Sequence, residues 1–364
     1  MRILVLCLPG LGDTLMFTPA LKLLRAHFPD ADIKALVMYR GSYEVLEGNP
    51  HLDEVILWEF LKEGFLKSLR FMLRLRRQRY DVSIIAFPAN RLQYNMVSFL
   101  AGAKLRLGHQ YRHQNLVHLP FVNHRTILES DELHNVEENL RLISLLGVGT
   151  EGVQPALEIY PSQADYEQAE AFWAERKLSQ KPFVFGIHVW STTLKDMHLK
   201  CWDRAKFAAL IDRLKESYDC EILLFEGPHD REVNDSIINA VRHRPIVVRG
   251  TTVKGTATIL QRCSLLVAND SGVMHVGAAV GVPIVAIFGP TNQKWVGPLS
   301  ERCMLVKKDL PCQPCFIYST KHLECKAGLN FECLTAIEVE DVLSAVETVL
   351  SQKTARAAGE MRVQ

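Results

Sequence analysis

The sequence has 364 residues, with 42 Lys and Arg against 41 Asp and Glu and a pI near 7.6. This balance disfavours a protein that binds nucleic acid through bulk charge, and no apolar run approaches the ~20 residues that a membrane-spanning helix needs. We therefore expect a soluble, cytoplasmic chain that is long enough for two domains. In that compartment the nine cysteines are reduced thiols or metal ligands rather than a disulfide framework.

The first part of the chain alternates apolar strands with amphipathic helices. Strands are predicted at 2–8, 33–37, 54–57 and 81–87. Helices are predicted at 13–28, after 41, and at 60–79, 92–100 and 136–146. Strands that alternate with helices predict a parallel sheet with both faces covered.

The same alternation then starts again. Strands are predicted at 182–189, 220–225, 245–248, 264–270 and 283–290. Helices are predicted at 162–178, 202–217, 230–241, 256–263, from 271, and at 336–351. We therefore predict an α/β fold of two Rossmann-like, doubly wound domains, 1–155 and 156–352, facing each other across a cleft. A C-terminal helix follows a Cys-rich segment, and a polar tail at 353–364 is expected to be disordered.

A glycine turn, Gly10-Leu11-Gly12-Asp13-Thr14, separates the first strand from the first helix. Glycines let the backbone approach a ligand closely, yet the turn carries a carboxylate and does not match G-x-G-x-x-G. Asp13 could cap the helix by accepting a backbone N–H. It could also act as a general base that takes a proton from an attacking hydroxyl. The motif by itself leaves both interpretations open.

A basic stretch lies in the first domain. Residues 61–112 contain 11 Lys and Arg against two acids, a local net charge of +9. The helix predicted at 60–79 carries Arg74 and Arg77 near its end. Such a run is either a solvated face helped by the helix dipole or a surface for anionic lipid or a phosphorylated acceptor.

A hydroxyl-rich loop follows the first strand of the second domain, in "GIHVWSTTLKDMHLKCW" (186–202). Thr192, Thr193 and Lys200 supply hydroxyls and a cation that suit a diphosphate; a solvated loop with incidental lysines is the alternative. Asp230 follows the next strand, where an acid could bind a ribose diol or cap a helix.

The most specific motif is "NDSGVMH" (269–275), in which a strand passes directly into a helix. Asp270, Ser271 and Gly272 lie at the helix start, where unpaired N–H groups and the dipole favour phosphate. His275 lies one turn further on the same face. It either binds a phosphate or sugar hydroxyl or is an interior histidine.

Four cysteines near the C-terminus have the spacing C-x₂-C-x₉-C-x₇-C. The C-x₂-C pair suits a tetrahedral thiolate site. A structural zinc or iron is therefore one interpretation, and unligated thiols or a redox-labile pair is the other. The four residues are Cys312, Cys315, Cys325 and Cys333.

Taken in order, the GLGD turn, the hydroxyl loop with its K-x-W and the N-D-S-G-x-x-H motif resemble glycosyltransferase family 9 over nearly the whole chain. This family comprises the heptosyltransferases and their relatives in lipopolysaccharide assembly. The resemblance implies a GT-B fold and inverting sugar transfer that requires no cofactor or metal. It also implies a donor, ADP-heptose, bound by the second domain, and a lipopolysaccharide core or other glycan acceptor at the cytoplasmic face of the inner membrane.

The resemblance also implies roles for single residues. Asp13 matches the catalytic base, and Gly12, Arg74 and Arg77 fall on the acceptor side. The donor-binding positions are Thr192, Thr193, Lys200, Asp230, Asp270, Ser271, Gly272 and His275. Ser271 stands where the lipopolysaccharide heptosyltransferases usually have threonine, and either hydroxyl can donate to a phosphate.

Several alternatives stay open at this point. The donor could be another nucleotide sugar, and the acceptor could be a protein. A nucleotide-sugar epimerase would use acids on both sides of the sugar, whereas only Asp13 is well placed. A nicotinamide-dependent oxidoreductase is disfavoured because G-x-G-x-x-G is absent. A binding protein without catalysis would make Asp13 dispensable.

Overall fold

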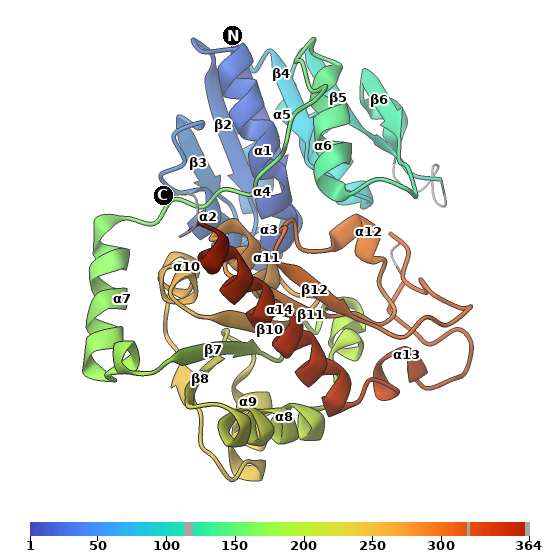
Figure 1. The fold of residues 1–364 in the computed structure, drawn as a ribbon. Coiled ribbons are helices and arrows are strands. Elements are labelled where there is room, and N and C mark those ends of the chain that lie inside the picture. Colours follow the sequence, from blue (N-terminus) through green and yellow to red (C-terminus); the bar gives the residue numbers. More distant parts are fainter. Residues whose placement is uncertain (113–118, 319–320, 361–364) are drawn as a thin grey trace. The chain divides into compact units, whose positions relative to one another are not determined.

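The computed structural model describes residues 1–112, 119–318 and 321–360 of the chain (Figure 1). It divides into two compact units, each with its own sheet. Unit 1 contains Met1–Tyr160 together with Tyr318, and unit 2 contains Pro161–Ile317 and the described residues from 321 onward.

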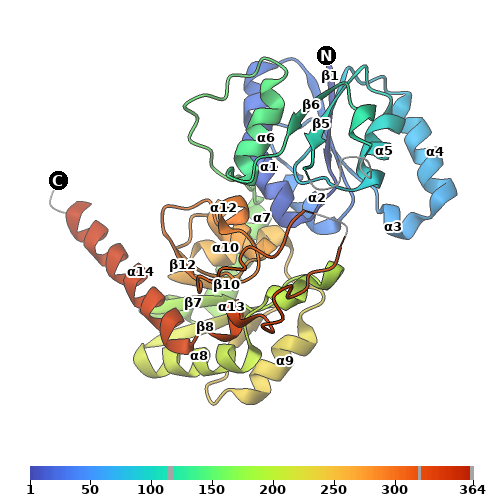
Figure 2. The same cartoon turned by 90° about the vertical axis from the view of Figure 1, so that its right-hand side faces the viewer.

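Unit 1 is a parallel sheet of six strands in the order β3-β2-β1-β4-β5-β6. Its strands are β1 (Arg2–Cys7), β2 (Asp32–Val37), β3 (Glu54–Leu57), β4 (Val82–Ile85), β5 (Leu105–Gln110) and β6 (Arg125–Leu128). Its helices are α1 (Leu11–His27), α2 (Arg40–Leu46), α3 (Phe60–Glu63), α4 (Phe65–Arg76), α5 (Leu92–Ala101), η1 (Pro120–Val122) and α6 (Asn135–Ser144). Helix α1 packs beside α6, and α4 packs beside α5 on the other side of the sheet (Figure 2).

Unit 2 repeats this topology with the order β12-β11-β10-β7-β8-β9. Its strands are β7 (Phe183–His188), β8 (Cys220–Phe225), β9 (Ile246–Val248), β10 (Leu265–Asn269), β11 (Ile284–Ile287) and β12 (Cys303–Val306). Its longer helices are α7 (Gln163–Glu175), α8 (Arg204–Ser217), α9 (Arg231–Ala240), α10 (Val253–Gln261), α11 (Gly272–Ala279) and α14 (Val339–Glu360). Its short helices are η2 (Leu178–Gln180), η3 (Leu194–Lys200), α12 (Gln293–Val296) and α13 (Glu332–Thr335).

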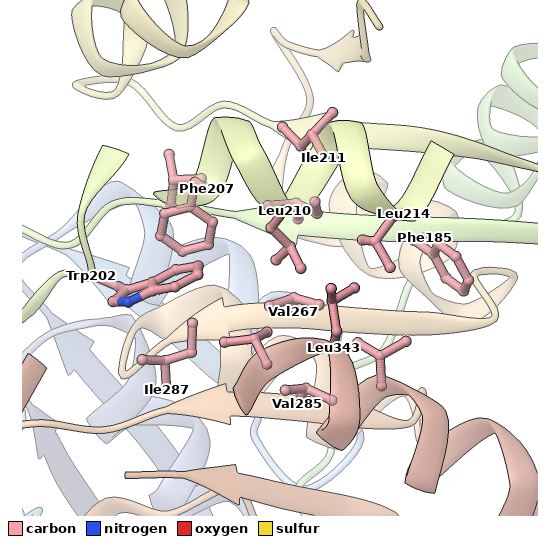
Figure 3. Packing of buried hydrophobic residues seen from close by; sticks show 14 of the residues in the cluster. Phe185, Trp202, Phe207, Leu210, Ile211, Leu214, Val267, Val285, Ile287 and Leu343 are labelled. Carbon is pink, nitrogen blue, oxygen red and sulfur yellow. The ribbon is translucent and has the colours of Figure 1, made fainter. Parts of the chain in front are cut away.

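The core of unit 2 explains why these apolar runs form strands and helices. Phe207, Leu210 and Leu214 of α8 recur with helical spacing and point toward the strands (Figure 3). Val267 and Val285 meet them from the neighbouring strands β10 and β11, and both are fully buried. The two doubly wound sheets confirm the predicted α/β class.

Several elements differ from the prediction. The basic helix expected at 60–79 is two helices, because Gly64 between them has φ +74°, a conformation that glycine adopts without strain. Strands β5, β6 and β12 were not predicted. The tail expected to be disordered at 353–364 continues helix α14 as far as Glu360, and residues 361–364 lie outside the described residues.

Candidate functional site

The predicted site residues of unit 2 follow the carboxyl ends of three adjacent strands. Strand β7 lies between β8 and β10, and all three are parallel. His188, Phe225 and Asn269 are the last residues of these strands. The loops that follow them therefore leave the same edge of the sheet, where open α/β sheets bind their ligands.

Lys200 and Asp270 form a buried ion pair at this edge. The Lys200 Nζ lies 2.7 Å from the Asp270 Oδ2, and the two residues are 8% and 4% exposed. The backbone beside them is fixed by Asn269, whose Oδ1 accepts from the Trp202 N–H at 3.0 Å and whose Nδ2 donates to the Val189 carbonyl at 2.8 Å. An ammonium group has three donors, so the pair orients Lys200 while leaving it further N–H groups.

His188 joins two predicted site residues that lie far apart in the sequence. Its Nδ1 is 3.1 Å from the Ser271 Oγ, and its Nε2 is 3.2 Å from the Asp230 Oδ2. A carboxylate only accepts hydrogen bonds, so Nε2 carries the proton toward Asp230 in this tautomer. In that tautomer Nδ1 accepts from the Ser271 hydroxyl. His188 is not among the predicted site residues; the signal for it in the sequence is its position at the end of β7, directly before the hydroxyl loop.

Asp230 does not cap its own helix. It occupies the N-cap position of α9 without a side-chain cap bond, which removes the capping alternative. Its Oδ2 accepts from the Gly227 N–H at 2.8 Å as well as from His188. The carboxylate is 6% exposed and is held by two donors.

The hydroxyl loop after β7 is more open. Thr192 and Thr193 are exposed, and the Thr192 Oγ1 accepts from the Leu194 N–H at 3.1 Å. Lys195 and Asp196 both have left-handed φ values, +56° and +57°, which cost a non-glycine residue roughly 1–2 kcal/mol each. Such conformations persist only where the surroundings hold them.

The Cys-rich segment supplies that support. The Leu323 N–H donates to the Lys195 carbonyl at 2.9 Å, and the His322 Nδ1 is 2.8 Å from the Asp196 Oδ2. A segment more than a hundred residues away in the sequence therefore fixes the hydroxyl loop.

Helix α11 begins at the same strand edge. Ser271 is its N-cap residue but makes no side-chain cap bond, because its hydroxyl faces His188. Gly272 is the first helical residue, and His275 is buried within the helix, 3% exposed. The structure thus forms one ion pair, Lys200–Asp270, and one chain of three side chains, Ser271–His188–Asp230. His275 lies one turn from Ser271.

In unit 1, Asp13 lies in the first turn of α1. Gly10 is the N-cap residue, with an extended backbone, so the interpretation of Asp13 as the N-cap is wrong. The Thr14 Oγ1 fixes the turn, 3.0 Å from both the Gly10 carbonyl and the Ser42 Oγ.

Asp13 is half-buried near two tyrosines of unit 1. Burial raises the pKa of Tyr94 to about 12; Arg91 opposes this shift, and Asp13 adds to it. Burial likewise raises the pKa of Tyr111, and Asp13 adds to that shift as well. Both phenols therefore stay protonated beside the carboxylate at neutral pH.

The other predicted acceptor-side residues lie on two elements of unit 1. Gly12 is the second residue of α1. Arg74 belongs to α4 and Arg77 is the C-cap residue of that helix.

The predicted zinc or iron site is not supported. Within residues 1–112, 119–318 and 321–360, no group of three His, Cys, Asp or Glu side chains is arranged to hold a metal ion. The Cys315 Sγ instead donates to the Cys312 carbonyl at 3.2 Å. Burial raises the pKa of Cys315, and it raises the pKa of Cys333 to about 11. Cys325 lies in the same segment, and it adds, as Cys312 and Cys315 do, to the raised pKa of Cys333.

The chain is similar to known proteins in sequence and in fold. The model of glycosyltransferase family 9 (heptosyltransferase) matches residues 68–326. The chain is 24% identical over 358 residues to lipopolysaccharide heptosyltransferase 3 of Escherichia coli, covering 94% of this chain and 97% of that protein. The crystal structure of a family 9 glycosyltransferase from Veillonella parvula matches with a TM-score of 0.78 and 26% identity, over 96% of this chain and 97% of that one. The structure of E. coli ADP-heptose lps heptosyltransferase II matches with a TM-score of 0.72 and 21% identity, over 97% and 100% of the chains.

Proposed function

Because the chain belongs to glycosyltransferase family 9, we propose that it transfers heptose from ADP-heptose to a hydroxyl of a lipopolysaccharide-type acceptor. The family, the full-length relatives and the two doubly wound sheets establish a glycosyltransferase of the predicted GT-B class. A heptosyltransferase of lipopolysaccharide biosynthesis is what its relatives support. The donor, the stereochemistry and the roles of single residues are the proposal.

The polar network at the strand ends of unit 2 carries this proposal. Lys200, oriented by Asp270, would direct its remaining N–H groups to the diphosphate of the donor. The exposed hydroxyls of Thr192 and Thr193 and the start of α11 would add neutral donors. Asp230, held by His188, would accept from a ribose hydroxyl.

The proposed transfer inverts the anomeric carbon in one displacement. The acceptor oxygen forms a bond to the anomeric carbon while the bond from that carbon to the β-phosphate oxygen breaks. Asp13 takes the proton of the acceptor hydroxyl, and ADP leaves with the electron pair of the broken bond. The Lys200 ammonium and the loop donors stabilise the charge that builds on the departing diphosphate, and we propose that this replaces a metal.

The position of Asp13 supports the role of base. It lies in the first turn of α1, not at the cap, and its neighbours Tyr94 and Tyr111 are protonated phenols at neutral pH. The same carboxylate becomes neutral once it holds the proton of the acceptor.

A panel of donors tests the proposal. Purified protein is mixed with ADP-heptose, or with UDP-, GDP- and other ADP-sugars, in the presence and absence of lipopolysaccharide core acceptors, and the released nucleotide is measured. We expect ADP release only when ADP-heptose and acceptor are both present. Release of nucleotide from another nucleotide sugar would show that the proposed donor is wrong. Release that is the same with and without the glycan acceptor would point to a protein acceptor or to hydrolysis.

We also propose that the reaction takes place at the cytoplasmic face of the inner membrane, where a lipid-linked acceptor is anchored. The basic composition of residues 61–112 supports this location.

A further inference from the structure

Helices α3 and α4 expose large apolar side chains that the fold does not use. Phe65 is 80% exposed, Leu61 72%, Leu66 70% and Leu73 51%. In the same helix, Phe71, Met72 and Leu75 are buried in the core of unit 1. Helix α4 therefore has one apolar face for the core and a second that faces solvent. Contiguous apolar surface of this kind marks an interaction site.

The positions along α4 divide its circumference into three stripes. With about 100° per residue, Phe65, Leu66, Leu69 and Leu73 fall within one sector of about 100°. Lys67, Arg70, Arg74 and Arg77 occupy the next sector, and the buried residues fill the third. Arg76, in the last turn of α4, also falls in the first sector and ends the exposed apolar stripe. Up to that point the apolar stripe is bordered by a basic stripe.

The basic stripe is largely uncompensated. Residues 60–79 contain seven Lys and Arg against one acid, Glu63. Lys67 is paired with Glu63 at 3.2 Å. Arg70, Arg74 and Arg77 are exposed, and within the described part of the chain none of them has an ion-pair partner. An anionic surface is the complement that this stripe lacks.

We propose that α3 and α4 dock unit 1 on an anionic bilayer, with the apolar stripe inserted into the interface and the arginines on the lipid headgroups. The described residues include no helix long and apolar enough to cross a membrane. The 12 residues of α4, about 18 Å long, suit a helix that lies in the plane of the surface. A second copy of the chain fits less well, since two such basic stripes would repel each other.

The surface gives the proposed function a route to a lipid-anchored acceptor. The two proposals can nevertheless fail separately, because vesicle binding requires neither a donor nor Asp13. In the reverse case, transfer to a soluble core oligosaccharide does not require a membrane.

Vesicle flotation tests the docking surface. The full chain is mixed with vesicles of phosphatidylcholine alone or with 30% phosphatidylglycerol, at low and high salt. We expect binding to the anionic vesicles only, weakened at high salt, where charges are screened within a few Å. Phe65→Ser combined with Leu66→Ser should weaken binding about tenfold or more, and Arg70→Gln about fivefold.

Phe121→Ser is the matched control, since Phe121 of unit 1 is 75% exposed outside these two helices. It should leave binding unchanged, and unaltered circular dichroism would show that every variant is folded. Equal binding to neutral and anionic vesicles, or no loss in the Phe65/Leu66 variant, would overturn the proposal. If the wild type is a dimer and the Phe65/Leu66 variant is a monomer, the stripe is instead the contact between two copies of the chain.

Discussion

Substitution of His188 should lower both the stability of unit 2 and its affinity for the donor. Its ring makes one neutral hydrogen bond, to Ser271, and one charge-assisted bond, to Asp230. A neutral bond contributes about 0.5–1.5 kcal/mol and a bond to a charged group about 1.5–3 kcal/mol. We expect His188→Ala to lower the free energy of unfolding by about 3 kcal/mol.

Two substitutions separate the contributions of the two bonds. The amide of His188→Asn lies where Nδ1 was, so it should keep the contact with Ser271 and lose about 2 kcal/mol with Asp230. The longer amide of His188→Gln approximates Nε2, so it should keep Asp230 and lose about 1 kcal/mol. The donor KM should rise most for Ala, by a factor of about 10, whereas kcat changes less because the network is proposed to bind the ground state as well.

Urea unfolding followed by tryptophan fluorescence suits this test. Four of the five tryptophans lie in unit 2, so the signal reports mainly on that unit: Trp173, Trp190, Trp202 and Trp295. His243→Asn is the matched control, because His243 pairs with Asp212 away from the strand ends. The reasoning is refuted if all three His188 variants unfold within about 0.5 kcal/mol of wild type with unchanged donor KM.

Three further predictions follow from the described contacts. Lys200→Met or Asp270→Asn alone should lower the free energy of unfolding by about 3–5 kcal/mol, because each leaves a buried charge unpaired. The double variant should regain stability but not donor binding. Equal losses of stability in the two single variants and the double variant would contradict the ion pair. Burial raises the pKa of Glu129 from 4.5 to about 7; because the folded chain then holds the proton more tightly, stability should fall as pH rises from 4.5 to 7, and Glu129→Gln should reduce that slope in urea titrations. Dialysis against EDTA should leave the transfer rate unchanged, and a loss that divalent cations restore would oppose metal-free transfer.

The alternating strands and helices could be predicted because a parallel sheet requires a clear hydrophobic pattern in the sequence. Buried strands such as β1 and β10 are continuous apolar runs, and the helices between them keep one apolar face. The residues directly after β7, β8 and β10 could be proposed as a site for the same reason, since the carboxyl ends of parallel strands share one edge.

The missed strands have weaker signals. Strand β5 reads Leu-Arg-Leu-Gly-His-Gln, with polar residues that tertiary contacts accommodate. Strands β6 and β12 have four residues each and lie at the edges of their sheets, where each pairs with one strand only. Short edge strands need little apolar pattern, because one flank faces no other strand.

The role of His188 was hidden for a different reason. Its two partners lie 42 and 83 residues away, so only the strand order brings the three side chains together. The cysteine spacing, by contrast, predicted a metal site that the structure does not support. A C-x₂-C motif indicates metal only when the fold turns the thiols toward one point, and the described residues show no such group.

The most direct test of the whole account is single-turnover transfer from ADP-heptose to a lipopolysaccharide core acceptor by wild type and by Asp13→Asn, with donor affinity measured in parallel. The account predicts that the asparagine variant binds ADP-heptose as wild type does and releases ADP about 10²–10⁴ times more slowly. Asp13→Asn that turns over at nearly the wild-type rate would contradict it, because the proton of the acceptor would then have another destination.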